Sequence, residues 1–321
     1  MSVAPLLKVQ DLHVRYKLRS GLFAHHELRA VNNISFELAP NETLGLVGES
    51  GCGKSSLGRA VIRLLEPAAG SIQFEGEDIT HLENAELRPR RKRFQMVFQD
   101  PYGSLNPRMT IGQIVGEPLD IHGLAENRGA REDRIRQLLQ SVGLLPEHVY
   151  RYPHEFSGGQ RQRIGIARAL AVEPRLLVCD EPVSALDVSV RAQIINLLQD
   201  LQRERGIALL FIAHDLAVVE HISHRIMVMY LGHAVEIGPA KEVTGRPAHP
   251  YTQALLAAVP KLKPAAQTRA AVSGDLPSPI NPPPGCPFQT RCPLVQDVCR
   301  RDMPPMREVA PNHFAACHVL P

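Results

Sequence analysis

The chain has 321 residues, a mass of 35.4 kDa and 44% hydrophobic residues, which is enough to bury the core of one large domain or of two. Its net charge of +3 and pI near 8.6 are too mild to indicate nucleic-acid binding, and the basic run 88–93 is interpreted as a solvated face. Because there is no apolar run of membrane-spanning length and no signal-peptide pattern at the start, we expect a cytoplasmic protein.

The first segment, residues 6–37, alternates apolar and polar side chains around a turn at Gly21. This pattern predicts antiparallel strands. Tyr16 lies in the first of them. Its flat ring is suited to stacking on an adenine base, whereas packing into the core is the commoner role of an aromatic residue in a strand. Both interpretations stay open.

Residues Gly48–Ser55 read Gly-Glu-Ser-Gly-Cys-Gly-Lys-Ser and fit the phosphate-binding pattern G-x-x-x-x-G-K-[ST]. A strand is predicted at 43–47 before them and a helix at 56–65 after them. Small residues let backbone N–H groups converge on a polyphosphate, while the lysine reaches the terminal phosphates and the serine hydroxyl binds Mg²⁺. The alternative is a glycine-rich turn that contains lysine by chance. We therefore predict nucleoside triphosphate binding.

A turn at 67–70 leads into a predicted strand at 71–74, and the β-like run 94–98 ends in Gln99. A glutamine at the exit of a core strand can ligate Mg²⁺ through its carbonyl and report the nucleotide's state to the following loop. By itself such a glutamine has no meaning. Helices are predicted at 111–116 and 131–142, which indicates a helical insertion in the sheet.

The pentapeptide Phe156–Gln160, Phe-Ser-Gly-Gly-Gln, precedes a basic, amphipathic helix predicted at 161–171. Two glycines ahead of a helix create a second N-terminus suited to an anion. The alternative is an ordinary helix cap in which Ser157 accepts hydrogen bonds from backbone N–H groups. One nucleotide needs only one phosphate loop, so a second anion site is informative.

An apolar strand predicted at 175–179 ends in Asp180 and Glu181. The aspartate at its tip is suited to hold Mg²⁺, and the adjacent glutamate to orient and polarise the attacking water. The alternative is an ordinary acidic boundary between a strand and a loop. The phosphate loop upstream favours the catalytic interpretation.

Ser184–Asp187 precedes a helix predicted at 189–205, which Gly206 stops. A further strand is predicted at 207–213, and His214 follows it directly. The imidazole of His214 can hydrogen-bond a γ-phosphate. A single histidine at a strand end is more often structural.

Together these motifs follow the order found in the ATPase domains of ABC transporters, which the chain resembles over residues 6–256. The one local departure is Phe156, where leucine is commonest. The resemblance implies an α/β fold: a RecA-like P-loop core with an antiparallel β subdomain and a helical subdomain at about 103–160. It also implies a head-to-tail dimer in which each ATP lies between one chain's phosphate loop and the other chain's Ser157–Gln160.

The site residues that the resemblance implies fall into three sets. The catalytic residues are Glu181, His214, Lys54 and Gln99. The Mg²⁺ ligands are Ser55, Gln99 and Asp180. The ATP-binding residues are Tyr16, Gly48, Glu49, Ser50, Gly51, Cys52, Gly53, Lys54, Ser55, Ser56, Gln99, Asp180, Ser157, Gly158, Gly159, Gln160 and Asp187.

Three further segments, 99–108, 249–256 and 282–288, resemble the ATPase subunits of bacterial dipeptide and oligopeptide importers, in particular the second, dipeptide-type subunit. This implies a heterodimer with a second ATPase at the cytoplasmic face of the inner membrane, two membrane permease subunits and a periplasmic substrate-binding protein, without nucleic acid. Relatives that carry nickel or glutathione share much of the pattern. A soluble ABC ATPase without a transport role is the distant alternative, because such proteins usually carry tandem cassettes.

Residues 257–321 form a Pro- and Cys-rich C-terminal extension, with a linker expected at 261–275 and little periodicity. Disulfides are not expected in a reducing cytoplasm, whereas four thiolates suit Zn²⁺ or an iron–sulfur cluster. The spacings are wider than in usual zinc sites, and Cys-Pro occurs twice, as in some cluster ligand runs. The importer ATPases that the chain resembles bind a [4Fe-4S] cluster at such cysteines, which favours the cluster over Zn²⁺. The four cysteines are Cys286, Cys292, Cys299 and Cys317.

Overall fold

The computed structural model describes residues 4–20, 24–258 and 277–320. The chain divides into two compact units, and each is described by itself. Unit 1 contains residues 1–39, 43–81 and 211–321, and unit 2 contains residues 40–42 and 82–210. The described residues include no helix that is both long enough and apolar enough to cross a membrane.

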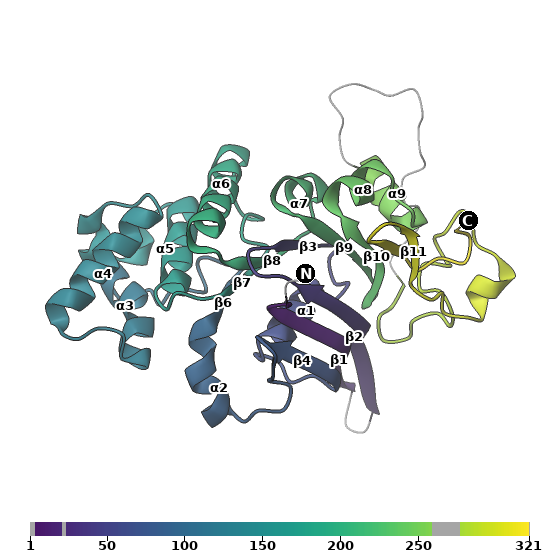
Figure 1. The fold of residues 1–321 in the computed structure, drawn as a ribbon, viewed down its shortest axis with the longest axis horizontal. Helices are drawn as coiled ribbons and strands as arrows, with labels where there is room; N and C mark the ends of the chain where they lie inside the picture. The colour runs from purple at the N-terminus through teal and green to yellow at the C-terminus, as the bar shows by residue number, and fades with distance from the viewer. Residues whose placement is uncertain (1–3, 21–23, 259–276, 321) are drawn as a thin grey trace. The chain divides into compact units, whose positions relative to one another are not determined.

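Unit 1 contains an antiparallel sheet built largely from the first segment of the chain (Figure 1). Val9 in the first strand pairs with Phe36 on one side and with Ile72 on the other. All three side chains are buried, so the apolar positions of the alternating pattern face the core. The two predicted antiparallel strands are thus confirmed, while the predicted turn at Gly21 lies outside the described residues. The strands, in the order β2-β1-β4-β5, are β1 (Leu7–Ser20), β2 (Ala24–Leu38), β4 (Ala69–Phe74) and β5 (Glu77–Asp78).

The second sheet of unit 1 has the order β11-β12-β10-β9-β3, and its strand β3 leads into the phosphate loop. All five residues of β3 are buried, as expected for a strand covered on both faces, and β3 runs parallel to β9. The strand predicted at 43–47 is confirmed. The strands are β3 (Thr43–Val47), β9 (Arg225–Tyr230), β10 (His233–Pro239), β11 (Arg307–Ala310) and β12 (His313–Ala315).

The helix after the phosphate loop, α1 (Lys54–Val61), begins and ends earlier than the predicted range 56–65. It ends because Arg63, just beyond it, adopts a left-handed backbone with φ 55°. At the other side of β3, an added Cβ on Gly45 would lie 2.2 Å from Val219, which shows how closely α7 packs on this strand. The other helices of unit 1 are α7 (Leu216–Ile222), α8 (Ala240–Gly245) and α9 (Pro250–Ala258).

The C-terminal extension is more ordered than its lack of periodicity suggested. It contains a 3₁₀ turn, η4 (Asp297–Arg300), and its strand β12 pairs with β10 through Glu236 and Ala315. Phe288 is only 1% exposed, and burial of such a ring contributes about 1.5–3 kcal/mol. The extension therefore gains apolar contacts from other parts of unit 1, where Phe288 contacts Tyr230 and Tyr251, instead of building a core of its own. The linker predicted at 261–275 lies outside the described residues.

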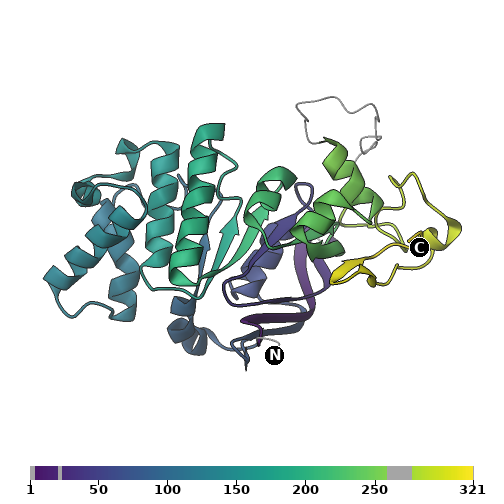
Figure 2. The ribbon, with the colours of Figure 1, turned by 45° about the horizontal axis from the view of Figure 1, so that its top comes forward.

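Unit 2 contains helices and the parallel pair β6 and β7, and residues 208–210 of β8, which neighbours β7, also belong to it. Figures 1 and 2 show α3, α4 and α5 side by side, in agreement with the predicted helical insertion. Its apolar face includes the buried residues Ile135 and Leu139. The elements are α2 (Asn84–Arg90), η1 (Arg91–Arg93), β6 (Phe94–Val97), α3 (Ile111–His122), α4 (Arg128–Ser141), η2 (Pro146–Tyr150), η3 (Pro153–Glu155), α5 (Gly158–Leu170), β7 (Leu176–Asp180), α6 (Val188–Arg205) and β8 (Ala208–Ala213).

Local signals account for most helix ends in unit 2. The helix predicted at 111–116 extends to His122, because Thr110 caps its start and Gly123, with φ 61°, ends it. Gly206 ends α6 as predicted, with φ 63°. The helix predicted at 161–171 begins earlier, at Gly158, so the two glycines belong to the first turn of α5.

Candidate functional site

The phosphate loop, residues Gly48–Ser55, joins the buried strand β3 to α1 in unit 1. Two of its glycines are required by their surroundings. An added Cβ would lie 2.3 Å from the carbonyl oxygen of Met229 at Gly48, and 2.0 Å from that of Ala30 at Gly53. Gly53 also has φ 106°, which L side chains rarely adopt. Glycine is therefore needed at these two positions because of contacts within the protein itself, and not only so that a ligand can approach the backbone.

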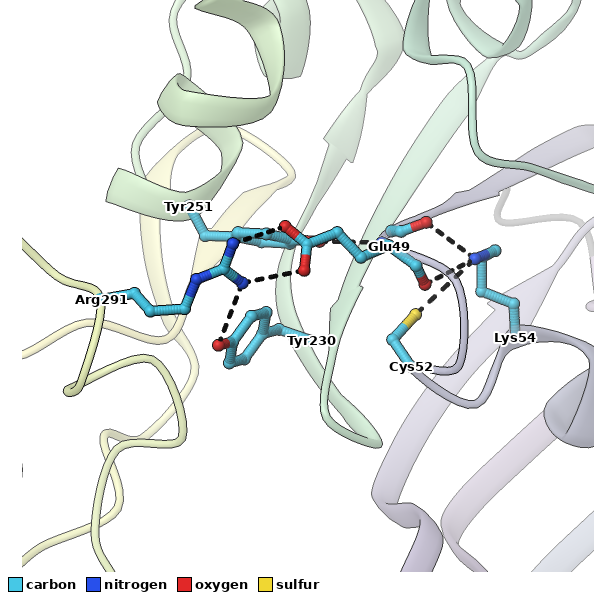
Figure 3. Close-up of polar contacts among 7 residues, drawn as sticks. Glu49, Cys52, Lys54, Tyr230, Tyr251 and Arg291 are labelled. Atoms are coloured by element: carbon cyan, nitrogen blue, oxygen red, sulfur yellow. Dashed lines mark hydrogen bonds and ion pairs between the residues drawn. The ribbon is translucent and has the colours of Figure 1, made fainter. Parts of the chain in front are cut away.

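Lys54 is 4% exposed and its ammonium is fixed inside the loop. Its Nζ donates hydrogen bonds to the carbonyl oxygens of Gly48, at 2.7 Å, and of Glu49, at 3.0 Å (Figure 3). Sγ of Cys52 lies 3.8 Å away, and burial is the main cause that raises the pKa of this thiol. Neutral carbonyl acceptors position the ammonium without cancelling its charge, so it is suited to an anionic ligand.

Glu49 is held from outside the loop by two residues that sequence reasoning missed. Its backbone N–H donates to Oη of Tyr251 in α9 at 2.9 Å. Its carboxylate receives two hydrogen bonds from Arg291 of the C-terminal extension, at 2.8 and 3.0 Å (Figure 3). Tyr251 lies inside a segment that the sequence analysis singled out, but no spacing signal identifies Arg291, because its contact with Glu49 spans 242 positions.

Two other predicted site residues lie in unit 1. Tyr16 of β1 is half-buried, and its hydroxyl lies 3.1 Å from that of Ser56, just after the phosphate loop. Tyr16 is thus neither fully in the core nor far from the loop. His214 is exposed and directly follows β8, ahead of Asp215, whose side chain caps α7.

In unit 2 the structure brings Gln99 and Glu181 together. Gln99, which follows β6, donates from Nε2 to Oε2 of Glu181 at 3.1 Å. Asp180 ends the adjacent strand β7 and is 1% exposed. The predicted metal ligand and general base are therefore consecutive residues with different surroundings, one buried at the strand end and one half-buried in the following turn.

Glu181 adopts a left-handed backbone with φ 44°, which is uncommon for a residue with a side chain. The turn is fixed by Ser184, whose N–H and hydroxyl both donate to the carbonyl oxygen of Glu181, at 3.2 and 3.1 Å. Such backbone strain costs of order 1–3 kcal/mol and concentrates at functional sites. It turns the Glu181 side chain away from the direction that a continued strand would impose.

The start of α5 has the cap that the sequence analysis left open as an alternative. The side chain of Ser157 accepts from the N–H of Gln160 at 3.4 Å, and the Gln160 side chain accepts from the N–H of Ser157 at 3.0 Å. A Cβ on Gly159 would lie 2.3 Å from Val190, so the glycine lets α5 and α6 approach closely. Asp187, which is exposed, precedes α6.

The four cysteines of the C-terminal extension are free thiols in one region of unit 1. Burial, together with the charges of the other three, raises the pKa of Cys286 to about 11. Burial is also the main cause that raises the pKa of Cys292 and of Cys317, and each of these is affected by Cys299. Among the described residues, however, no three or more His, Cys, Asp or Glu side chains have the arrangement of a metal site.

Comparison with known proteins identifies the family. The ABC transporter family matches residues 31–184, and the oligopeptide/dipeptide transporter C-terminal region matches residues 235–299. The oligopeptide transport ATP-binding protein AppF of Bacillus subtilis is 51% identical over 320 residues, covering 98% of this chain and 97% of that protein. The chain belongs to the ATP-binding proteins of peptide ABC transporters. Another such ATP-binding protein, named for peptide import in Brucella ovis, is 52% identical over 318 residues and covers 99% of this chain and 98% of its own.

Solved structures show the fold of this ABC ATP-binding protein. The ATP-binding cassette MJ0796, in a dimeric post-hydrolysis state bound to ADP and phosphate, has a TM-score of 0.66 and 27% identity and covers 73% of this chain and 98% of its own. CbiO1 from Clostridium perfringens, part of an ABC transporter complex, has a TM-score of 0.64 and 27% identity over 75% of this chain and 91% of its own. The predicted ABC ATPase fold is confirmed.

Proposed function

We propose that the chain binds and hydrolyses Mg²⁺-ATP to drive the import of dipeptides or oligopeptides through a membrane transporter. The observation that carries this proposal is the phosphate loop, in which carbonyl oxygens of the loop hold the ammonium of the buried Lys54. The chain also matches a peptide-transporter ATP-binding protein over 98% of its length. The family also implies permease partners in the membrane. We assign residues 6–256 to the nucleotide-binding domain, with its helical subdomain at about 103–160, and residues 257–321 to the extension.

The proposed phosphate cradle consists of the backbone N–H groups of residues 48–56, with Lys54 reaching the terminal phosphates. Tyr16 is proposed to stack on the adenine, a role supported by its hydroxyl lying 3.1 Å from that of Ser56. Oxygen ligands suit Mg²⁺, and Ser55, Gln99 and Asp180 each supply one. Bound there, Mg²⁺ would neutralise charge on the phosphates.

Glu181 is the proposed general base. Its carboxylate accepts a hydrogen bond from Gln99, a neutral partner that orients it while leaving it able to accept a proton from water. His214 is proposed to donate a hydrogen bond to the γ-phosphate.

The proposed ATP site is completed by the start of α5 from a second ATPase subunit. The N-terminus of this helix, capped by Ser157, carries partial positive charge, and Asp187 lies at the start of the neighbouring helix α6. The partner is proposed to be a different, homologous ATPase. Two permease subunits and a periplasmic substrate-binding protein complete the transporter, which places the chain at the cytoplasmic face of the inner membrane.

For the extension we propose a [4Fe-4S] cluster held by Cys286, Cys292, Cys299 and Cys317. Four free thiols that affect one another electrostatically are the soft donor set that such a cluster needs, and Zn²⁺ is the alternative ligand. Binding would require their deprotonation and some rearrangement, because the described residues do not form a metal site as they stand. Such a cluster would cross-link the extension and would take no part in ATP hydrolysis.

Affinity purification of the full chain from native membranes tests the transport function. We expect two apolar membrane subunits and a second ATPase to co-purify, with ATPase activity that Lys54→Ala abolishes. Co-purification with ribosomes instead would favour the soluble ABC ATPase. Stimulation of that activity by nickel- or glutathione-loaded binding proteins, but not by peptide-loaded ones, would assign another solute.

A further inference from the structure

An ion pair connects the C-terminal extension to the phosphate loop within unit 1. Arg291 donates from Nη1 to Oε2 of Glu49 at 2.8 Å and from Nη2 to Oε1 at 3.0 Å. The side chains are 7% and 27% exposed. Two parallel hydrogen bonds between a planar guanidinium and a carboxylate are stronger and more directional than a surface pair. The pair therefore fixes the orientation of Glu49.

Glu49 lies at the centre of the contacts in Figure 3. Its carboxylate binds Arg291, its N–H donates to Tyr251, and its carbonyl oxygen accepts from Nζ of Lys54 at 3.0 Å. Every polar group of this one residue is thus engaged, and one of its partners is the lysine that the phosphate loop requires. A shift of Glu49 would move an acceptor that positions the Lys54 ammonium.

Arg291 reaches Glu49 because the extension is anchored beside it. Phe288 packs edge-on against Tyr230, with ring centroids 5.2 Å apart, and lies 5.4 Å from the ring of Tyr251. The N–H of Arg291 donates to the carbonyl oxygen of Phe288 at 3.0 Å, which closes a tight turn. Nη1 of Arg291 also donates to Oη of Tyr230 at 3.4 Å. These contacts hold the turn 288–291 in place and thereby fix the position of the Arg291 guanidinium.

We propose that Arg291 is a positioning residue of the phosphate loop, which sets the loop's affinity for nucleotide through Glu49 and makes that affinity depend on the docked turn 288–291. The proposal rests on the proposed binding of nucleotide at this loop. Arg291 touches no nucleotide in this scheme. Its effect passes through Glu49 to Lys54, and the residue that presents it belongs to the extension instead of the cassette.

The test is titration of the purified full chain with a fluorescent ATP analogue, recording the dissociation constant and the binding stoichiometry separately. We expect Arg291→Met to weaken binding about tenfold at unchanged stoichiometry. Arg291→Lys should recover only part of the loss, because an ammonium cannot form the bidentate pair. Arg300→Met, at an exposed arginine of the same extension, is the matched control and should bind as the wild type does.

Two further variants test whether the effect of Arg291 on binding passes through Glu49 and depends on the docked turn 288–291. Glu49→Ala, which removes both carboxylate oxygens, should weaken binding, and adding Arg291→Met to it should weaken binding no further, because the contact is already lost. Phe288→Ala, which removes the ring that anchors the turn 288–291, should also weaken binding. Combining it with Arg291→Met should weaken binding no more than Arg291→Met alone. Additive losses would overturn the proposal, and so would a lower stoichiometry with an unchanged dissociation constant, since that result indicates misfolding alone.

The proposal and the proposed function fail in different ways. If Lys54→Ala binds the analogue as tightly as the wild type, the loop is not the nucleotide site and the proposed function is wrong. If Lys54→Ala abolishes binding while Arg291→Met binds normally, the nucleotide site is supported and only the role of Arg291 is overturned.

Discussion

Gln99 donates a hydrogen bond from Nε2 to Oε2 of Glu181 at 3.1 Å, although 82 positions separate the two residues in the chain. The bond joins the ends of two neighbouring parallel strands, β6 and β7. It orients a carboxylate that stands directly after the buried Asp180. The first prediction depends on this arrangement.

Glu181→Gln should retain ATP binding but slow hydrolysis by roughly 10²- to 10⁴-fold, because the water loses its general base while the phosphate cradle stays intact. Turnover and nucleotide affinity of the assembled transporter are the quantities to measure. Lys54→Ala is the contrasting variant, since it should weaken binding itself. Near-normal turnover by Glu181→Gln would remove Glu181 from the mechanism.

Ser157→Arg should abolish hydrolysis at the site whose phosphate loop belongs to the partner ATPase, because a bulky cation blocks the backbone N–H groups at the start of α5. The same chain should still bind ATP at its own loop. Ser157→Thr keeps a hydroxyl that can cap the helix and serves as the control for the lost cap. A strictly monomeric chain that hydrolysed ATP at the full rate of the complex would exclude the shared site.

Anaerobically purified protein should be brown and contain about four iron and four sulfide per chain, if the cysteines of the extension hold one cubane cluster. Cys299→Ser should bleach it, whereas Cys52→Ser, in the phosphate loop, should keep the colour. One equivalent of zinc without sulfide would support the alternative. A colourless protein without metal would contradict both assignments.

His249 predicts a pH dependence of stability. It is 1% exposed, and burial lowers its pKa to about 3, because the imidazole must stay neutral inside the protein. Its Nδ1 accepts from the backbone N–H of Tyr251 at 3.0 Å, and the backbone N–H of His249 donates to the carboxylate of Glu236 at 2.9 Å. The stability that its neutral form contributes is therefore complete above the unfolded pKa, near 6.5, and is lost as pH falls toward 3.

The measurement is the free energy of unfolding by urea between pH 6.5 and 4. Protonation of His249 in the unfolded chain alone contributes a slope of up to about 1.4 kcal/mol per pH unit. His249→Asn keeps a side-chain oxygen that can accept from the Tyr251 N–H and removes the titration. In this variant the slope of the unfolding free energy against pH should be smaller by up to about 1.4 kcal/mol per pH unit, which corresponds to one proton. A slope equal to that of the wild type would refute the assignment.

Features that depend on neighbouring residues were accessible from the sequence. The phosphate loop and its strand, the stop of α6 at Gly206 and the cap at Ser157 each follow from contacts within a few positions. The family followed as well, because its motifs are short and ordered along the chain. The starts of α1 and α5 were placed late, since their first turns consist of the glycines and polar residues that were interpreted as loop.

Only the tertiary structure decided how the phosphate loop is supported. Glu49 contacts Tyr251 and Arg291 across 202 and 242 positions, and no periodicity or spacing encodes contacts over such distances. The same holds for Phe288, which lacks a periodic pattern around it and is buried because Tyr230 and Tyr251 supply the apolar surface. Local sequence determined the loop that suits a phosphate. The packing of distant side chains decided that the C-terminal extension holds that loop in place.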